Sequence, residues 1–262
     1  MIARYFSHIW KDRYVLWELT TKALSIKYKR SMLGMAWSVL VPLGLASIIG
    51  CVYGVLFGVP PRTFLPILFS GLNVWILILG CADGGTQAFL AAEGYLKQTL
   101  VNMEIFPARL VLTNFINFLY SIIAYFLIYA FIGTEFFSVK MLLFFPGCIV
   151  LFVFLLAVSN ITAIFNLIAR DYQPFQSIIL QGVFYATPII YLPSMLEEKG
   201  YAFIYKLNPF YYFISIIRTP LLGKEIAPLS EYIIATSIAF ILFGFSIWLV
   251  MREKRRGVVF RL

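Results

Sequence analysis

The stretch that decides the fold is YKRSMLGMAWSVLVP, residues 28–42. Lys27, Lys29 and Arg30 stand at its start, and no charged residue follows until Arg62. Cations set against a long apolar segment are typical of the point where a polypeptide leaves the cytoplasmic surface and enters a bilayer. The stretch therefore predicts a membrane-spanning helix that begins just after a basic edge.

The composition of the whole chain also indicates a membrane protein. Of 262 residues, 61% are hydrophobic and 13% are charged, whereas a soluble domain has about 45–50% apolar and about 25% charged residues. The length is enough for one membrane domain. The net charge of +9 comes from Lys and Arg residues that gather at the edges of apolar segments, a distribution that argues against nucleic acid as a partner.

Six charge-free intervals are each long enough to span a bilayer, because about 20 helical residues rising 1.5 Å each cross about 30 Å of hydrocarbon. The intervals are 31–61, 63–82, 110–134, 141–169, 172–196 and 232–251. A seventh interval, 207–217, is too short to span and is interpreted as re-entrant or interfacial. We therefore predict an all-α membrane protein with six transmembrane helices and re-entrant extracytoplasmic helices between spans five and six.

The orientation follows from the distribution of cations along these spans. With both termini in the cytoplasm, 15 of the 21 Lys and Arg residues fall in cytoplasmic segments and six fall outside. Positive residues are enriched on the cytoplasmic side of membrane proteins. The sequence thus predicts a multi-pass protein whose termini are both cytoplasmic.

Residues 1–27 are predicted to form an amphipathic helix in the headgroup plane, ahead of a single six-span domain at 28–262. An amphipathic basic helix rich in aromatic residues is typical of the membrane interface. The alternative is a helix that packs on a soluble partner. His8, the only histidine, is interpreted as a bystander there. The apolar face holds Ile2, Tyr5, Phe6 and Ile9, and the basic face holds Arg4, Lys11 and Arg13.

A short cytoplasmic helix is predicted between spans two and three. Glu93, Lys97 and Glu104 interrupt the apolar pattern there, and Pro107 marks its end. Such a helix is either a structural cap of the bundle or a binding surface for another protein. The residues alone leave both readings open.

No motif in the sequence supports catalysis. It contains no GxxxxGK[ST] phosphate loop, no HExxH, and no second histidine for an acid–base pair. We therefore expect no enzyme activity and no metal site. Asp83 is interpreted as an interfacial acid, since a proton-coupling acid belongs nearer mid-membrane with an ionisable partner.

The aromatic content is high, with 26 Phe, 16 Tyr and 5 Trp. Most such residues face lipid or form interfacial belts, but flat rings in a pore would stack on the apolar faces of sugars. A sugar polymer needs a lined channel, because each unpaired hydroxyl in hydrocarbon costs several kcal/mol. The candidate channel residues are Tyr53, Phe57, Trp75, Tyr185 and Tyr191.

Four segments, taken in order, resemble the permease subunit of the type-two ABC exporters, in the bacterial polysaccharide-export branch of O-antigen, capsule and teichoic-acid permeases. One departure is visible: where the family often carries two adjacent cations before its Phe-Pro, this chain has Asn102, Met103 and Glu104. The matching segments are YKRSMLGMAWSVLVP at 28–42, LVNMEIFPARL at 100–110, ARDYQPFQSIILQGVFYATPIIY at 169–191 and LNPFYYFISIIRTPLLG at 207–223.

The resemblance implies a half-transporter in the bacterial inner (plasma) membrane. Two copies of the chain would form the pore, and two copies of a separate ABC nucleotide-binding subunit, which holds the ATP and Mg, would drive it. The substrate would be a polyprenyl-diphosphate-linked glycan. A related permease for drugs or small lipids is the alternative, and a passive channel or scaffold is a more distant one.

The resemblance also assigns roles to two groups of residues. One group would couple the permease to the ATPase. The other is a basic cluster that would attract the diphosphate of the substrate, or would only anchor the topology and contact anionic lipid. The coupling group is Glu93, Tyr95, Lys97, Glu104 and Phe106, and the basic cluster is Lys27, Lys29 and Arg30.

Overall fold

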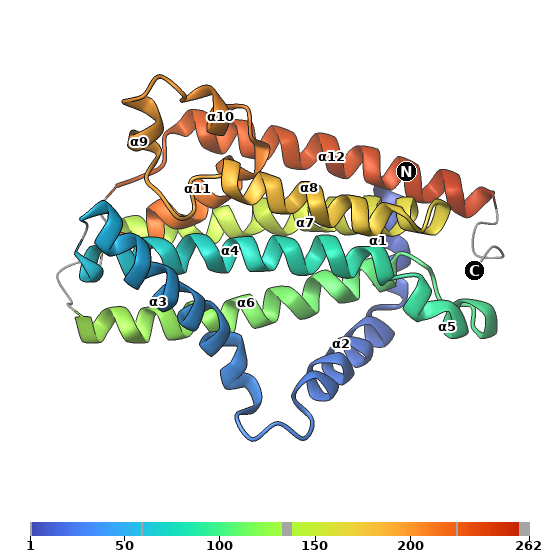
Figure 1. The fold of residues 1–262 in the computed structure, drawn as a ribbon. Helices are drawn as coiled ribbons and strands as arrows, with labels where there is room; N and C mark the ends of the chain where they lie inside the picture. The colour runs from blue at the N-terminus through green and yellow to red at the C-terminus, as the bar shows by residue number, and fades with distance from the viewer. Residues whose placement is uncertain (1, 59, 133–137, 224, 257–262) are drawn as a thin grey trace.

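The computed structural model describes residues 2–58, 60–132, 138–223 and 225–256, and every regular element in these ranges is a helix (Figure 1). Five helices in the described ranges are long and apolar enough to cross a membrane. This finding confirms the all-α class, and the five helices are candidate spans that coincide with five of the predicted intervals. The five helices are α3 (Trp37–Phe57), α4 (Pro61–Gln87), α6 (Ile105–Ile132), α7 (Phe144–Ile168) and α12 (Leu229–Arg255).

The interval 172–196, predicted as a continuous fifth span, is divided in the structure. It holds the helix α8 (Tyr172–Ala186), an irregular segment over 187–192, and the short helix α9 (Pro193–Glu197). The 15 residues of α8 rise only about 22 Å, less than a hydrocarbon core of about 30 Å. Prolines at 188 and 193 lack the backbone N–H that a continuing helix needs. The interval therefore contains a helix shorter than the sequence predicted.

Helix α4 lies at the centre of the bundle and contacts α3, α6, α7 and α8. Its polar Ser70 and Asn73 are buried together with its apolar face. Helices α7 and α12 pack along each other, and α7 also packs against α4 (Figure 1). The centre of the bundle is thus shared by α4 and α7, and the remaining helices surround them.

The glycine pair at the end of α4 allows close packing on both sides. A Cβ on Gly85 would lie 2.1 Å from Thr162 Oγ1 and 3.1 Å from the Ser159 backbone on α7. A Cβ on Gly84 would lie 2.9 Å from the Leu110 side chain on α6. These distances show that the pair lies where α4 packs closely against α6 and α7.

We expect Gly85→Val to destabilise the fold, because overpacking a close helix contact typically costs about 1–3 kcal/mol. The measurement is the melting temperature of the purified protein in mild detergent. Gly244→Val is the matched control, since a Cβ on Gly244 of α12 meets nothing within 4 Å. Equal melting temperatures for the two variants would contradict the close approach of α4 and α7.

Helix α11 (Pro209–Leu221) is inserted between α4, α7 and α12. Asn208 caps it by accepting from Phe210 N at 3.0 Å, and donates through Nδ2 to Thr187 Oγ1 at 2.6 Å. The buried Arg218 donates from Nη1 to the carbonyl of Pro188 at 2.7 Å. These contacts fasten α11, predicted as the short helix 207–217, to the irregular segment that follows α8. The small helix α10 (Phe203–Lys206) precedes it.

The amino-terminal segment is two helices, α1 (Ile2–Lys11) and α2 (Arg13–Tyr28), where the sequence predicted one. The break lies at Asp12, whose Oδ2 accepts from Asn102 N at 3.1 Å and from Asn102 Nδ2 at 2.7 Å. Tyr5 is buried against the bundle, with its ring 5.8 Å from that of Phe243. Tyr5, on the amphipathic face of α1, therefore packs on α12.

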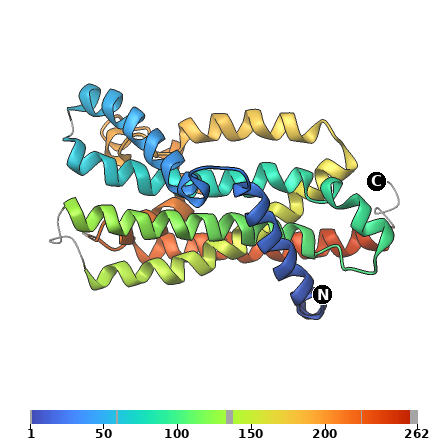
Figure 2. The same cartoon turned by 90° about the horizontal axis from the view of Figure 1, so that it is seen from below.

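The elbow, residues 29–36, joins α2 to α3 and stands away from the bundle, so that the two helices form a V (Figure 1). Seen from below, α2 and α3 run from the elbow in opposite directions (Figure 2). Arg30 and Gly34 both have positive φ values, 66° and 50°. A left-handed conformation is unusual for a residue other than glycine. These two positions reverse the chain between the two helices.

Candidate functional site

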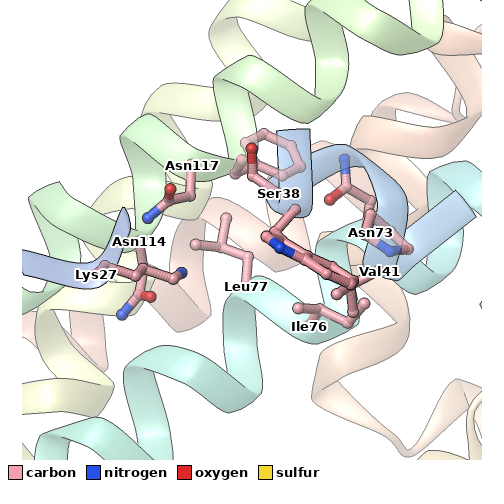
Figure 3. A pocket seen from close by; sticks show the side chains of 11 residues that line it. Lys27, Ser38, Val41, Asn73, Ile76, Leu77, Asn114 and Asn117 are labelled. Carbon is pink, nitrogen blue, oxygen red and sulfur yellow. The ribbon is translucent and has the colours of Figure 1, made fainter. Parts of the chain in front are cut away.

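A pocket lies under the elbow, at the place where the sequence begins its first span (Figure 3). Its volume is about 170 Å³, and its walls come from the end of α2, the start of α3, and the facing sides of α4 and α6. The walls mix apolar side chains with amides, one hydroxyl and one cation. They are Lys27, Trp37, Ser38, Val41, Pro42, Asn73, Ile76, Leu77, Asn114, Asn117 and Phe118.

Three asparagines give this elbow pocket its polar character. Asn114 donates to the Gly80 carbonyl at 3.2 Å. Asn117 donates to the Thr113 carbonyl at 2.8 Å and accepts from the Tyr28 hydroxyl. Both amide NH₂ groups are therefore already engaged within the chain.

Asn73 differs from the other two asparagines. It is only 4% exposed, and its Nδ2 has no hydrogen-bond partner within the described part of the chain. A buried donor without a partner costs about 1–3 kcal/mol. Because Asn73 lines the pocket, a ligand that offers an acceptor oxygen would satisfy this donor.

Lys27 is the cation that the structure places in the pocket wall, at the end of α2. Partial burial lowers the pKa of Lys27 below its usual value, because desolvation disfavours the charged ammonium. Lys29 and Arg30 lie on the exposed elbow and do not line the pocket. Of the predicted basic cluster, one residue thus reaches the pocket and two face outward.

Among the candidate channel aromatics whose side chains the structure describes, only some lie together. Trp75 is 3% exposed and packs against Phe184 and Phe210, with ring centroids 5.6 Å apart in each case. Tyr191 is half-buried and donates to the Tyr185 carbonyl at 3.0 Å. These residues meet at the end of α8.

The other channel candidates are more scattered. Tyr185 itself is 62% exposed. Tyr53 is half-buried on α3, and the side chain of Phe57 lies outside the part of the chain that the structure describes. Their role in a channel stays a prediction.

The predicted coupling residues divide into two groups. Glu93, Tyr95 and Lys97 are exposed on or beside the short helix α5 (Glu93–Gln98), and Lys97 Nζ lies 2.6 Å from Glu93 Oε1. The hydrogen bond from Lys97 lowers the pKa of Glu93. Glu104 and Phe106 are instead buried. Of these five residues, the structure leaves only the first group accessible at the surface.

Glu104 is fully buried in a polar cluster that we call the tail cluster: His8, Asp12, Asn102, Glu104 and Lys254. Lys254 Nζ lies 3.1 Å from Glu104 Oε1, and His8 Nδ1 lies 2.9 Å from the same oxygen. Lys254 also donates to Asn102 Oδ1 at 3.0 Å. The interpretation of His8 as a bystander was therefore wrong: it ties α1 to the segment ahead of α6.

Asp83 links α4 to α8. Its Oδ1 accepts from Gln176 Nε2 at 3.1 Å and lies 3.5 Å from Ser177 Oγ. The neighbouring Gln87 donates to Gln173, also on α8. The hydrogen-bond partners of Asp83 are thus uncharged side chains, and these contacts join α4 to α8.

Comparison with known proteins places the chain in a family. A family model described as ABC-2 type transporter matches residues 14–222. The chain is similar to two proteins named O-antigen export system permease protein RfbA. It is 29% identical over 194 residues to the one from Klebsiella pneumoniae, covering 73% of each chain, and 28% identical over 211 residues to the one from Myxococcus xanthus, covering 79% of each. The chain belongs to the ABC-2 type transporter family.

Proposed function

We propose that this chain is the permease subunit of an ATP-driven exporter that moves a polyprenyl-diphosphate-linked polysaccharide out of the cytoplasm across the inner membrane. The relatives named O-antigen export system permease support an O-antigen type of substrate over a capsule or teichoic-acid type. The observation that carries the proposal within the structure is the elbow pocket, where a cation and an unpartnered amide donor meet apolar walls. A lipid-linked diphosphate has the matching chemistry, an anionic head beside an apolar chain.

In this proposal, the substrate is loaded at the elbow. Lys27 attracts the diphosphate, and Asn73 donates to one of its oxygens or to the first sugar. The exposed apolar residues of the elbow and the start of α3, such as Met35 and Trp37, face the acyl region and accommodate the polyprenyl chain. Lys29 and Arg30 act at longer range, as an electrostatic guide toward the pocket and as topology anchors.

We further propose that two copies of the chain enclose the pore. Helix α8 leaves an apolar face uncovered in the single chain, including Phe175, Ile178 and Tyr185. A face of this kind is covered either by lipid or by a second copy of the chain. The aromatic rings at its end can stack on the apolar faces of a sugar polymer. In this arrangement, α8 with the irregular segment 187–192 completes the sixth crossing, and α11 is a re-entrant helix on the extracytoplasmic side.

The ATPase would bind through α5, at the end of the bundle where α12 also ends (Figure 1). The proposal places this end, and with it both termini, in the cytoplasm. Glu93, Tyr95 and Lys97 supply the exposed contact, while the buried Glu104 and Phe106 hold the segment rigid enough to transmit movement. ATP and Mg belong to that partner.

The proposal predicts the phenotype of a strain that lacks this chain. We expect loss of the surface polysaccharide and accumulation of its polyprenyl-linked form on the cytoplasmic side, measured by lipid extraction and glycan analysis. Re-expression of the wild-type chain should restore export. Unchanged surface glycan together with altered sensitivity to drugs would instead assign the chain to the related permeases for drugs or small lipids.

A further inference from the structure

A second charged surface lies at the end of α12, where it meets α1. One hollow of about 340 Å³ is lined by Arg4, His8, Met251, Lys254 and Arg255. A neighbouring hollow of about 320 Å³ is lined by Trp248, Met251, Arg252, Arg255 and Arg256. The two share Met251 and Arg255, so they form one continuous surface, which we call the tail groove.

The positive charge of the tail groove exceeds what the neighbouring carboxylates neutralise. Glu104 is occupied by Lys254 and His8. Glu253 lies 3.2 Å from Arg256 and 3.8 Å from Arg252.

Arg4 and Arg255 remain without a carboxylate. Both are exposed, and neither makes a side-chain hydrogen bond or ion pair within the described ranges of the chain. A guanidinium group can donate two parallel hydrogen bonds to two oxygens of a phosphate, and two such groups lie beside this hollow. The groove therefore has an unused capacity to bind an anion.

An exposed apolar stripe leads along α12 directly to this groove. Ile241, Phe245 and Trp248 are exposed, and their spacing of four and three residues puts them on the face that continues to Arg252 and Arg255. The rings of Phe245 and Trp248 are stacked with centroids 5.8 Å apart. The guanidinium of Arg252 lies 5.1 Å from the centre of the Trp248 ring. The surface is thus apolar along the helix and cationic at its end.

We propose that the tail groove binds the phosphodiester headgroup of an acidic phospholipid, with the acyl chains along the α12 stripe. Clustered cations beside a membrane helix favour anionic headgroups, and a tryptophan at the boundary suits the headgroup level. An acidic protein surface would use the arginines but not the stripe. The inference rests on the proposed cytoplasmic position of this end, but not on the identity of the exported glycan. The site is formed by α1 and α12, whereas the elbow pocket is formed by α2, α3, α4 and α6.

The test compares phosphatidylglycerol with phosphatidylcholine retained by the purified permease–ATPase complex, measured by native mass spectrometry. The variant Arg4→Gln/Arg255→Gln is expected to bind phosphatidylglycerol about ten- to thirty-fold more weakly at low salt. The control Lys11→Gln/Lys22→Gln removes the same charge from exposed positions of α1 and α2 outside the groove and should bind as the wild type does. Equal losses in both double variants would overturn the proposal.

Trp248→Ala distinguishes a lipid from a free phosphate. It keeps every cation, so we expect weaker binding of phosphatidylglycerol and no effect on inorganic phosphate. If inorganic phosphate competes for the groove as well as the lipid does, the site is an anion site and the proposal fails. Loss of the ATPase from the arginine variant, with lipid binding unchanged, would make the groove a protein contact and would also overturn it. Single Arg255→Gln, at an exposed position, provides the same comparison if the double variant does not fold.

Discussion

Glu104→Gln is expected to destabilise the folded chain by about 3 kcal/mol. Glu104 is fully buried, and its carboxylate is the partner of both Lys254 and His8. Removing one charge of a buried pair leaves the other uncompensated, which typically costs about 3–5 kcal/mol. The lower end applies here because the Lys254 side chain is 33% exposed and water compensates part of its charge.

The measurement is the melting temperature of the purified chain in mild detergent, which should fall by about 5–10 °C for a protein of this size. Glu93→Gln is the control: it also breaks a Glu–Lys pair, but one whose side chains are 46% and 45% exposed, and it should leave the melting temperature unchanged. Glu104→Leu combined with Lys254→Met should recover part of the loss, because both charges disappear together. A melting temperature for Glu104→Gln equal to that of the wild type would show that the tail cluster does not hold the chain ends together.

Lys27→Glu is expected to reduce polysaccharide export at least ten-fold. The substitution puts a negative charge in the wall of the elbow pocket, where the proposal requires a diphosphate to bind. Two like charges at close range repel each other. Export is measured as surface glycan per molecule of permease in the membrane, so that a change in insertion or abundance is not counted as a change in transport.

Lys22→Glu is the matched control for Lys27→Glu. Lys22 is exposed on the same helix α2 but does not line the pocket. Asn73→Leu tests the second donor without changing the charge, and it should also lower export. If Lys27→Glu and Lys22→Glu export equally well, the diphosphate does not bind in the elbow pocket.

The long helices could be predicted from the absence of charge alone. The predicted interval 232–251 became α12 (Leu229–Arg255), which extends at both ends because a helix can carry charged residues once it leaves the apolar layer. The same criterion failed over 172–196. Prolines at 188 and 193 interrupt that interval without adding any charge, so a scan for charges did not detect the break.

The contacts between distant segments could not be predicted from one sequence. His8 and Glu104 are 96 residues apart, and Glu104 and Lys254 are 150 residues apart. Periodicity reports the face of a single helix, and no local pattern joins residues at such separations.

The elbow pocket was missed for a different reason. Asn73, Asn114 and Asn117 are uncharged, so they lie inside intervals that the charge scan treated as uniformly apolar. Polar side chains within membrane helices are costly and are often functional. A search for amides within the spans would have found all three, but only the fold shows that Lys27, and not Lys29 or Arg30, lies beside them.

The most direct test of lipid-linked glycan export is translocation in proteoliposomes that contain the purified chain with its cognate ATPase and a polyprenyl-diphosphate-linked glycan. The measurement is the fraction of glycan that crosses to the far side, where an added glycosidase cleaves it. We predict translocation that requires ATP, is abolished without this chain, and is strongly reduced by Lys27→Glu but not by Lys22→Glu. A glycan that stays protected in the presence of ATP, while a drug or small lipid is moved by the same vesicles, would contradict the proposed function.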